Sequence, residues 1–197
     1  MKVLLINNDS DTWSKLVTVV RATGYDVTTS HHSDIGSIDI GAYDLAILSG
    51  GWWYDDPIEL LKEYAEELHF IRTTPIPIFG ICIGMQLMHV AVDQAVPLMD
   101  EPQSGDKIIS INKTGQQLFG FPDELEVFKN HTRAIYETDP QFELLAEAEG
   151  HVEIMRHKTR PLLGVQFHPE AGPVDEASQR LMVLIGGLLK SPSVKML

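Results

Sequence analysis

Apolar residues occur in short runs along the first half of the chain, and segments with helical spacing separate these runs. The runs cover residues 3–7, 25–29, 44–48 and 77–81. The runs over residues 3–7, 44–48 and 77–81 are mostly aliphatic, as expected for buried strands of a sheet, whereas residues 25–29 are rich in β-branched and aromatic residues, which also indicates a strand. Between them, the pattern predicts helices over about residues 11–22, capped by Asp11 or Thr12, and 57–72, with Pro57 in the first turn. Strands and helices that alternate in this way indicate βαβ units and an open, mostly parallel α/β sheet with helices on both faces.

The second half of the chain has a different pattern, in which turn signals separate shorter apolar runs. These runs predict strands over residues 107–111, 125–129, 134–136, 151–156 and 162–167. We expect mixed or antiparallel strands that extend the same sheet. An amphipathic pattern over residues 174–189 predicts a final helix. Because the sequence has no low-complexity linker and no internal repeat, we expect one domain over residues 1–197.

The composition narrows the class of protein. Of the 197 residues, 44% are hydrophobic, which is enough for a core, and the formal net charge is −13. A charge of this sign argues against nucleic acid and anionic membranes as partners, because both attract a basic surface. No apolar stretch approaches the roughly 20 residues of a transmembrane helix, so we expect a cytoplasmic protein. The single cysteine excludes an internal disulfide.

That cysteine, Cys82, lies where a predicted strand meets a predicted helix, in the segment Gly80-Ile-Cys-Ile-Gly-Met-Gln86. Glycines two residues before and after a nucleophile are typical of a nucleophile elbow, in which small neighbours let the strand and the helix pass closely. The turn exposes the sulfur at a helix N-terminus, where backbone N–H groups favour the thiolate. On this motif alone, a buried and unreactive cysteine is an equal alternative.

A thiol nucleophile needs a base and a group that orients the base, and the segment Gly164-Val-Gln-Phe-His-Pro-Glu170 supplies both. A strand ends just before His168, which places the imidazole at the sheet edge. Glu170 can reach back to the ring and set its tautomer. An isolated His-Pro pair would more simply be a surface histidine. The other histidines lack this setting, and His31-His-Ser-Asp34 has no second ligand cluster in the sequence, so we predict no metal site.

Attack on a carboxamide creates an oxyanion that needs two N–H donors. The elbow supplies the N–H of Ile83, the residue after the nucleophile. Another predicted strand ends in Ser49-Gly50-Gly51 on the same edge, and we assign the second donor to Gly51. A plain turn after a strand is the alternative for this glycine pair.

Three segments, taken in chain order, closely resemble the motifs of the class I (triad-type) glutamine amidotransferases: residues 49–51, 80–86 and 164–170. The resemblance implies a flavodoxin-like α/β fold and a glutaminase. In such an enzyme, Cys82 would attack the side-chain amide of L-glutamine and form a γ-glutamyl thioester. His168 would give a proton to the leaving ammonia and then activate water, and Glu170 would orient His168. The family needs no metal or organic cofactor for this reaction.

The resemblance extends to the residues that hold the substrate. Gln86 matches the motif glutamine that helps to bind the amino-acid end of the substrate. The segment Asn130-His-Thr-Arg133 resembles the family segment whose backbone, near Thr132 and Arg133, contacts the α-amino and α-carboxylate groups. Most such domains deliver ammonia to a synthase. Since too few residues follow Glu170 for a synthase domain, we expect the partner to be a separate synthase subunit.

The chain also departs from the family pattern. Trp52-Trp-Tyr-Asp-Asp56 stands where a proline usually follows the glycine pair, Met85 precedes Gln86 where many members have histidine, and residues 91–95 lack the usual Gly-Gly. The candidate synthases are those of anthranilate, aminodeoxychorismate, GMP and imidazole glycerol phosphate, and the cysteine turn favours the last slightly. The aromatic residues leave a second hypothesis open, a free-standing hydrolase of γ-glutamyl amides or peptides. A non-catalytic interaction protein is the third.

Overall fold

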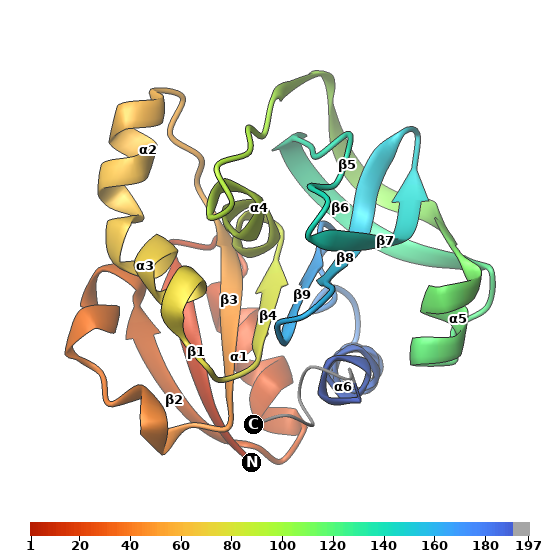
Figure 1. Ribbon diagram of the computed structural model, residues 1–197. Helices are drawn as coiled ribbons and strands as arrows, with labels where there is room; N and C mark the ends of the chain where they lie inside the picture. The colour runs from red at the N-terminus through yellow and green to blue at the C-terminus, as the bar shows by residue number, and fades with distance from the viewer. Residues whose placement is uncertain (191–197) are drawn as a thin grey trace.

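The computed structural model describes residues 1–190, which form a nine-stranded mixed sheet with helices on both faces (Figure 1). The strand order is β2-β1-β3-β4-β9-β8-β7-β5-β6. The strands are β1 (Lys2–Asn8), β2 (Asp26–His31), β3 (Leu45–Gly51), β4 (Ile78–Ile81), β5 (Leu98–Ile111), β6 (Glu124–Arg133), β7 (Phe142–Ala148), β8 (His151–His157) and β9 (Leu162–Val165). The helices are α1 (Trp13–Ala22), α2 (Pro57–Glu63), α3 (Ala65–Thr73), α4 (Ile83–Val90), α5 (Lys113–Phe119) and α6 (Val174–Leu189), with short 3₁₀ helices η1 (His32–Ser37) and η2 (Ile40–Ala42). None of the helices in the described part of the chain combines the length and the apolar character needed to cross a bilayer.

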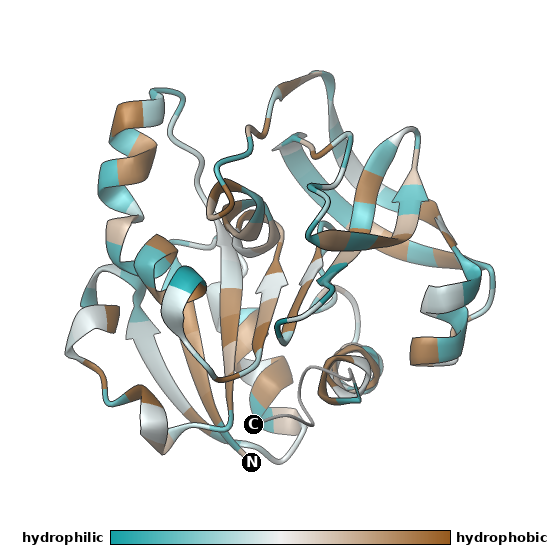
Figure 2. Ribbon diagram, in the orientation of Figure 1, coloured by the Kyte–Doolittle hydropathy of each residue, from teal (hydrophilic) through white to brown (hydrophobic). Residues whose placement is uncertain are grey.

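Five neighbouring strands, β2, β1, β3, β4 and β9, form the parallel part of the sheet. Successive residues of a strand point to opposite faces. Val3 and Leu5 of β1 accordingly pack in one core cluster with residues of α1 and α6, whereas Leu4 and Ile6 pack in a second cluster with residues of α3 and α4. Figure 2 shows hydrophobic residues concentrated in these central strands. Burial on both faces explains the continuous apolar runs of β1, β3 and β4, whereas the edge strand β2 is partly exposed, and the predicted mostly parallel α/β arrangement is confirmed.

The strands β8, β7, β5 and β6 form the antiparallel part that was expected from the second half of the chain. The predicted strand over residues 134–136 is wrong. Ala134 and Ile135 are fully buried in a connection that makes isolated backbone bonds to Pro97 and Val152 instead of a ladder. The apolar side chains of Ala134 and Ile135 are therefore explained by their burial in the core and not by a strand. Neither β7 nor α5 was predicted from the sequence, and the Glu, Leu and Ala residues of β7 have higher helix than strand propensity.

The single helix predicted over residues 57–72 is also wrong, because the chain forms two helices, α2 and α3, that are separated at Tyr64. The backbone of Tyr64 leaves the helical region, with φ −94° and ψ 18°. Its side chain is 1% exposed, and its hydroxyl donates a hydrogen bond to the carbonyl of Trp52 at 2.7 Å. The burial of Tyr64 and its hydrogen bond to Trp52 therefore interrupt the helix, although the helical pattern of the sequence is continuous there.

Candidate active site

The three sequence motifs meet at the carboxyl edge of the parallel strands. β3 ends in Gly50 and Gly51, β4 leads directly into Cys82, and the chain after β9 reaches His168. β3, β4 and β9 are consecutive neighbours in the sheet. Open α/β sheets bind their ligands at this edge. The common edge that the sequence predicts is therefore present in the structure.

Cys82 lies in a strained turn between β4 and α4. Its φ of 51° and ψ of −107° are rare for a residue other than glycine. A Cβ atom on Gly80 would lie 2.7 Å from the carbonyl of Gly84, and a Cβ atom on Gly84 would lie 2.8 Å from Leu48. Only glycine fits at both positions, as an elbow requires. Cys82 is the N-cap residue of α4, whose first residue is Ile83.

His168 and Glu170 form a buried pair in which Nδ1 of the ring lies 2.8 Å from Oε1 of the carboxylate. Burial alone would lower the pKa of His168, but contacts with Cys82 and Glu170 stabilise the protonated ring and raise the pKa to about 11. Burial likewise opposes ionisation of Glu170, yet the hydrogen bond and charge of His168 hold the pKa of Glu170 below its ordinary value. In the described part of the chain, Nδ1 faces the carboxylate and the buried Nε2 has no hydrogen-bond partner, so Nε2 is the nitrogen that can exchange a proton with a reacting group.

Gly50 packs directly on the cysteine and the histidine. A Cβ atom at this position would approach Cε1 of His168 to 3.1 Å and Cβ of Cys82 to 3.6 Å. The end of β3 therefore lies close to both side chains, and a larger residue at Gly50 would crowd the His168 ring. From the sequence, a role was predicted for Gly51 and none for Gly50.

Gly51 itself lies against the end of β1. A Cβ atom on Gly51 would lie 1.8 Å from the carbonyl oxygen of Asn8, so glycine is required there as well. The Asn8 amide donates to the carbonyl of Ser49 at 3.2 Å and to the buried carboxyl of Glu67 at 3.1 Å. Burial raises the pKa of Glu67 to about 8, despite the opposing hydrogen bond from Asn8. A buried polar network therefore supports the loop with the expected oxyanion donor, and the role of Gly51 and Ile83 as donors stays a prediction.

Thr12 is a member of the site that the sequence analysis treated only as a helix cap. Thr12 occupies the N-cap position of α1, but its side chain makes no capping bond. Its hydroxyl instead donates to Oε1 of Glu170 at 2.8 Å, the oxygen that also faces His168. The two residues are 158 positions apart, so no local pattern could have linked them.

Gln166 is a second residue that the sequence analysis did not single out. Its Nε2 donates to Sγ of Cys82 at 3.6 Å, and its Oε1 accepts from Nε2 of Gln86 at 3.0 Å. Gln86 also donates to the carbonyl of Arg133 at 2.9 Å. These bonds connect the nucleophile with the segment expected to hold the substrate. The signal in the sequence was a polar residue inside an otherwise apolar strand end.

The side chain of Arg133 joins two loops beside the site. Its Nη2 lies 2.7 Å from Oδ1 of Asp55, its Nη1 donates to the carbonyl of Val96 at 3.0 Å, and its guanidinium lies 5.1 Å from the ring centre of Trp53. A cavity of about 490 Å³ is lined by these residues and by Tyr54. The unusual aromatic segment therefore borders a cavity next to the expected substrate-binding residues.

The structure brings most of the predicted site residues together: Cys82, His168, Glu170, Gly51, Ile83, Gln86 and Arg133. Thr132 precedes Arg133 in β6 and is exposed. The assignment of catalytic, oxyanion and substrate-binding roles to these residues stays a prediction at this point.

Comparisons with known proteins agree with the family that the sequence motifs resemble. The family model described as glutamine amidotransferase class-I matches residues 4–182. A glutamine-hydrolyzing GMP synthase subunit from Thermoplasma volcanium is 30% identical over 172 residues, which are 86% of this chain and 83% of that protein. Aminodeoxychorismate synthase from Streptomyces griseus is 34% identical over 181 residues, which are 87% of this chain and 24% of that protein.

Solved structures agree with the fold. The crystal structure of a GMP synthase subunit protein from Thermoplasma acidophilum matches with a TM-score of 0.83 and 25% identity, over 100% of this chain and 98% of that chain. A glutamine amidotransferase from Thermotoga maritima matches with a TM-score of 0.71 at 19% identity, over 96% of this chain and 84% of that chain. The flavodoxin-like fold that the resemblance implied is confirmed.

Proposed function

The chain belongs to the class I glutamine amidotransferase family and is a glutamine-hydrolysing enzyme, and on that premise we propose that it works through a covalent thioester at Cys82 and supplies ammonia to a separate synthase subunit. The convergence of the strained Cys82 with the His168–Glu170 pair is the observation that supports this proposal most strongly. We further propose that residues 1–197 act as one domain, since residues 2–165 contribute to a single continuous sheet.

In the first half of the proposed reaction, the Cys82 thiolate attacks the side-chain carbonyl carbon of glutamine. The N–H groups of Gly51 and Ile83 stabilise the resulting oxyanion. The carbon–nitrogen bond then breaks, the protonated ring of His168 gives its proton to the departing nitrogen, and ammonia leaves. Glu170 holds the ring in orientation throughout.

In the second half, His168 accepts a proton from water while the water oxygen attacks the thioester. The carbon–sulfur bond breaks, glutamate leaves and the thiolate is restored. Gln86 and the backbone at Thr132 and Arg133 bind the α-amino and α-carboxylate groups of the substrate. The hydrogen bond from Gln86 to the Arg133 carbonyl supports their joint role.

A glutamine-mimicking affinity label tests the thioester. We expect stoichiometric modification of Cys82, located by mass spectrometry of peptides, and no modification of a Cys82→Ala variant. Protection by free glutamine would show that the label enters the substrate site. Hydrolysis of glutamine by the Cys82→Ala variant at the wild-type rate would contradict the proposal.

An exposed apolar surface beside the cavity supports a protein partner. Trp52, Ile58 and Leu61 are 62%, 77% and 48% exposed, and Figure 2 shows hydrophobic residues on α2. Gathered exposed apolar side chains mark interaction sites. The Thermoplasma volcanium relative is named as one subunit of GMP synthase, which supports a synthase encoded as a separate chain. The relatives above have GMP and aminodeoxychorismate synthase names, and the slight preference for the imidazole glycerol phosphate type stays a prediction.

Variants on this surface test the partner. We expect Leu61→Glu to prevent co-purification of the synthase and its stimulation of ammonia release, because a charge would be buried in the contact. Met182→Glu on α6, another exposed hydrophobic residue, is the matched control. Full glutaminase activity of the isolated chain, with no protein retained in pull-downs, would contradict a docked synthase.

The cavity near Arg133 favours one alternative, a free-standing hydrolase of γ-glutamyl amides or peptides. A substrate with a larger group beyond the glutamyl unit could stack on Trp53 and Tyr54, which line it. Rates for a panel of γ-glutamyl compounds decide between the two functions. A strict preference for free glutamine would rule out the alternative.

A further inference from the structure

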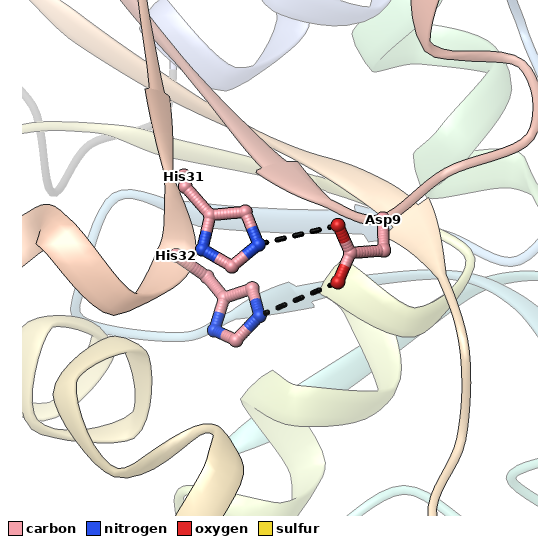
Figure 3. A group of neighbouring side chains, drawn as sticks. All are labelled: Asp9, His31 and His32. Atoms are coloured by element: carbon pink, nitrogen blue, oxygen red, sulfur yellow. Dashed lines mark hydrogen bonds and ion pairs between the residues drawn. The ribbon is translucent and has the colours of Figure 1, made fainter.

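Asp9, His31 and His32 come together at the carboxyl edge of the sheet, next to the active site but outside it (Figure 3). Asp9 follows β1, His31 ends β2 and His32 begins η1. Nε2 of His31 lies 3.2 Å from one carboxylate oxygen of Asp9, and Nε2 of His32 lies 4.0 Å from the other. The sequence alone showed two adjacent histidines, and the parallel pairing of β1 with β2 places the carboxylate opposite both rings.

A carboxylate at the end of α2 adds negative charge beside the three ligand groups. Oε1 of Glu63 lies 3.8 Å from Nε2 of His32, so this buried nitrogen faces two carboxylates at distances longer than a hydrogen bond. A tetrahedral ion with ligands at about 2.0–2.1 Å separates neighbouring ligand atoms by about 3.3–3.4 Å. The ligand atoms of Asp9, His31 and His32 all lie within 4.8 Å of one another, and Nε2 of His31 is 3.2 Å from the Asp9 carboxylate, so side-chain rotations would bring these three groups to that edge length.

We propose that Asp9, His31 and His32 bind one divalent transition-metal ion of the zinc type through two Nε2 atoms and one carboxylate oxygen, with water completing the coordination. Mixed imidazole and carboxylate ligands suit Zn²⁺ better than the oxygen-seeking Mg²⁺. Burial and the neighbouring His31 lower the pKa of His32, against the opposing charges of Glu63 and Asp9, and the neutral ring is the form that binds metal.

The surroundings of the proposed site fit this role. Nδ1 of His31 accepts the backbone N–H of Ser33 at 3.3 Å and lies 2.8 Å from Oγ of Ser33, and these contacts orient the ring with Nε2 towards Asp9. The side chains of Asp9 and Glu63 are 54% and 42% exposed, which gives an ion access from solvent. Asp9 itself has a φ of 60°, a left-handed backbone that is uncommon for a residue other than glycine.

An ion at this place would act on the active site through the segment around Asp9. On one side, Asn8 bonds to Ser49 in the strand that ends in Gly51. On the other side, Ser10 Oγ lies 3.0 Å from Thr12 Oγ1, and the Thr12 hydroxyl binds Glu170. Fixing Asp9 would therefore restrain a segment that supports both the expected oxyanion donor and the triad carboxylate.

Zinc chloride titrated into the metal-stripped full chain, followed by calorimetry, tests the site. The titration uses a Cys82→Ser background, because the cysteine and His168 could themselves bind zinc. We expect one Zn²⁺ per chain, and a loss of affinity of at least about tenfold in His31→Ala and in Asp9→Asn. His69→Ala, which removes an exposed histidine on α3, should bind as the parent does. No binding by the parent, or equal affinity in all variants, would overturn the proposal.

Two further measurements guard against misinterpretation. His32 packs on the ring of Tyr64 at 4.8 Å, so His32→Ala could disturb folding, and the affinity test therefore uses His31→Ala and Asp9→Asn. Hydrogen exchange of the amides of residues 8–12 should slow on addition of zinc and not of magnesium. Displacement of zinc by equimolar Mg²⁺ would contradict a site of the zinc type. None of these measurements requires glutaminase activity.

Discussion

The parallel and antiparallel parts of the sheet contribute different components to the site. The parallel strands end on the groups expected to react, since β4 leads into Cys82 and β9 leads towards His168. The antiparallel strands supply one wall of the cavity beside the site. There, β6 ends in Arg133, whose side chain bonds to Asp55, next to the aromatic residues 52–54, and to the carbonyl of Val96. This difference indicates a division of roles. Changes at the parallel edge should act on the chemical step, whereas changes in the antiparallel part should act on substrate binding or on stability.

The antiparallel part also contains a fully buried ion pair. Nζ of Lys129 in β6 lies 2.5 Å from Oε1 of Glu153 in β8, and both side chains are at most 1% exposed. Burial raises the pKa of Glu153 to about 7, although the charge and hydrogen bond of Lys129 oppose this shift. Glu153 also accepts the backbone N–H of Gln166 through its carbonyl. The backbone of Glu153 is therefore bonded to Gln166, two residues before His168.

The largest effect is expected at the parallel edge. Glu170→Gln should lower kcat by about 10²- to 10⁴-fold, because the neutral amide orients the ring of His168 poorly and does not stabilise its charge. Since Glu170 is one of the contacts that raise the pKa of His168, the alkaline limb of the kcat/KM profile should move to lower pH. Thr12→Val, which removes one hydrogen bond to Glu170, should lose about tenfold or less. Unchanged kcat in Glu170→Gln would remove the distinction between the two parts.

In the antiparallel part, Lys129→Met should reduce the free energy of unfolding by about 3–5 kcal/mol, because the Glu153 carboxylate loses its partner in the core. The double variant Lys129→Met/Glu153→Leu should recover most of this loss. Urea denaturation of the single and double variants measures both values. Equal destabilisation in the two would show that packing, and not an unpaired charge, sets the cost.

The support under Gly51 should make stability depend on pH. The folded pKa of Glu67, about 8, lies above the ordinary value of about 4.3, so its contribution is fully present below the ordinary value and is lost as pH rises through about 8. We expect wild type to lose on the order of 3 kcal/mol from this group between pH 5 and pH 8. Glu67→Gln should show a flatter profile in urea denaturation, and the exposed neighbour variant Glu66→Gln should follow wild type.

The smallest effect is expected at the wall of the site. Arg133→Lys should raise KM for glutamine by roughly three- to tenfold with little change in kcat, because lysine cannot reach Asp55 and the Val96 carbonyl with one planar group. Arg156→Lys in β8, which faces Glu143, is the matched control. A fall in kcat with KM unchanged would place Arg133 with the reacting groups and contradict the proposed division.

Much of the parallel part could be predicted from the sequence, and less of the antiparallel part. Strands buried on both faces leave continuous apolar runs, so β1, β3 and β4 were evident. In the antiparallel part, residues 134–136 have the apolar character of a strand but lie in a buried connection, and β7 has residues that favour helix. There, pairing with distant strands overrides local preference.

The sequence by itself determined the features that depend on local sterics: the βαβ alternation, the glycines of the elbow and the adjacency of His168 and Glu170. Each follows from neighbours within a few residues, where chain geometry permits few alternatives. Only the tertiary structure decided which distant groups meet them: Thr12 at Glu170, Gln166 between Cys82 and Gln86, and Asp9 opposite His31 and His32. These contacts depend on strand order and on the direction of side chains at strand ends, which local periodicity does not specify.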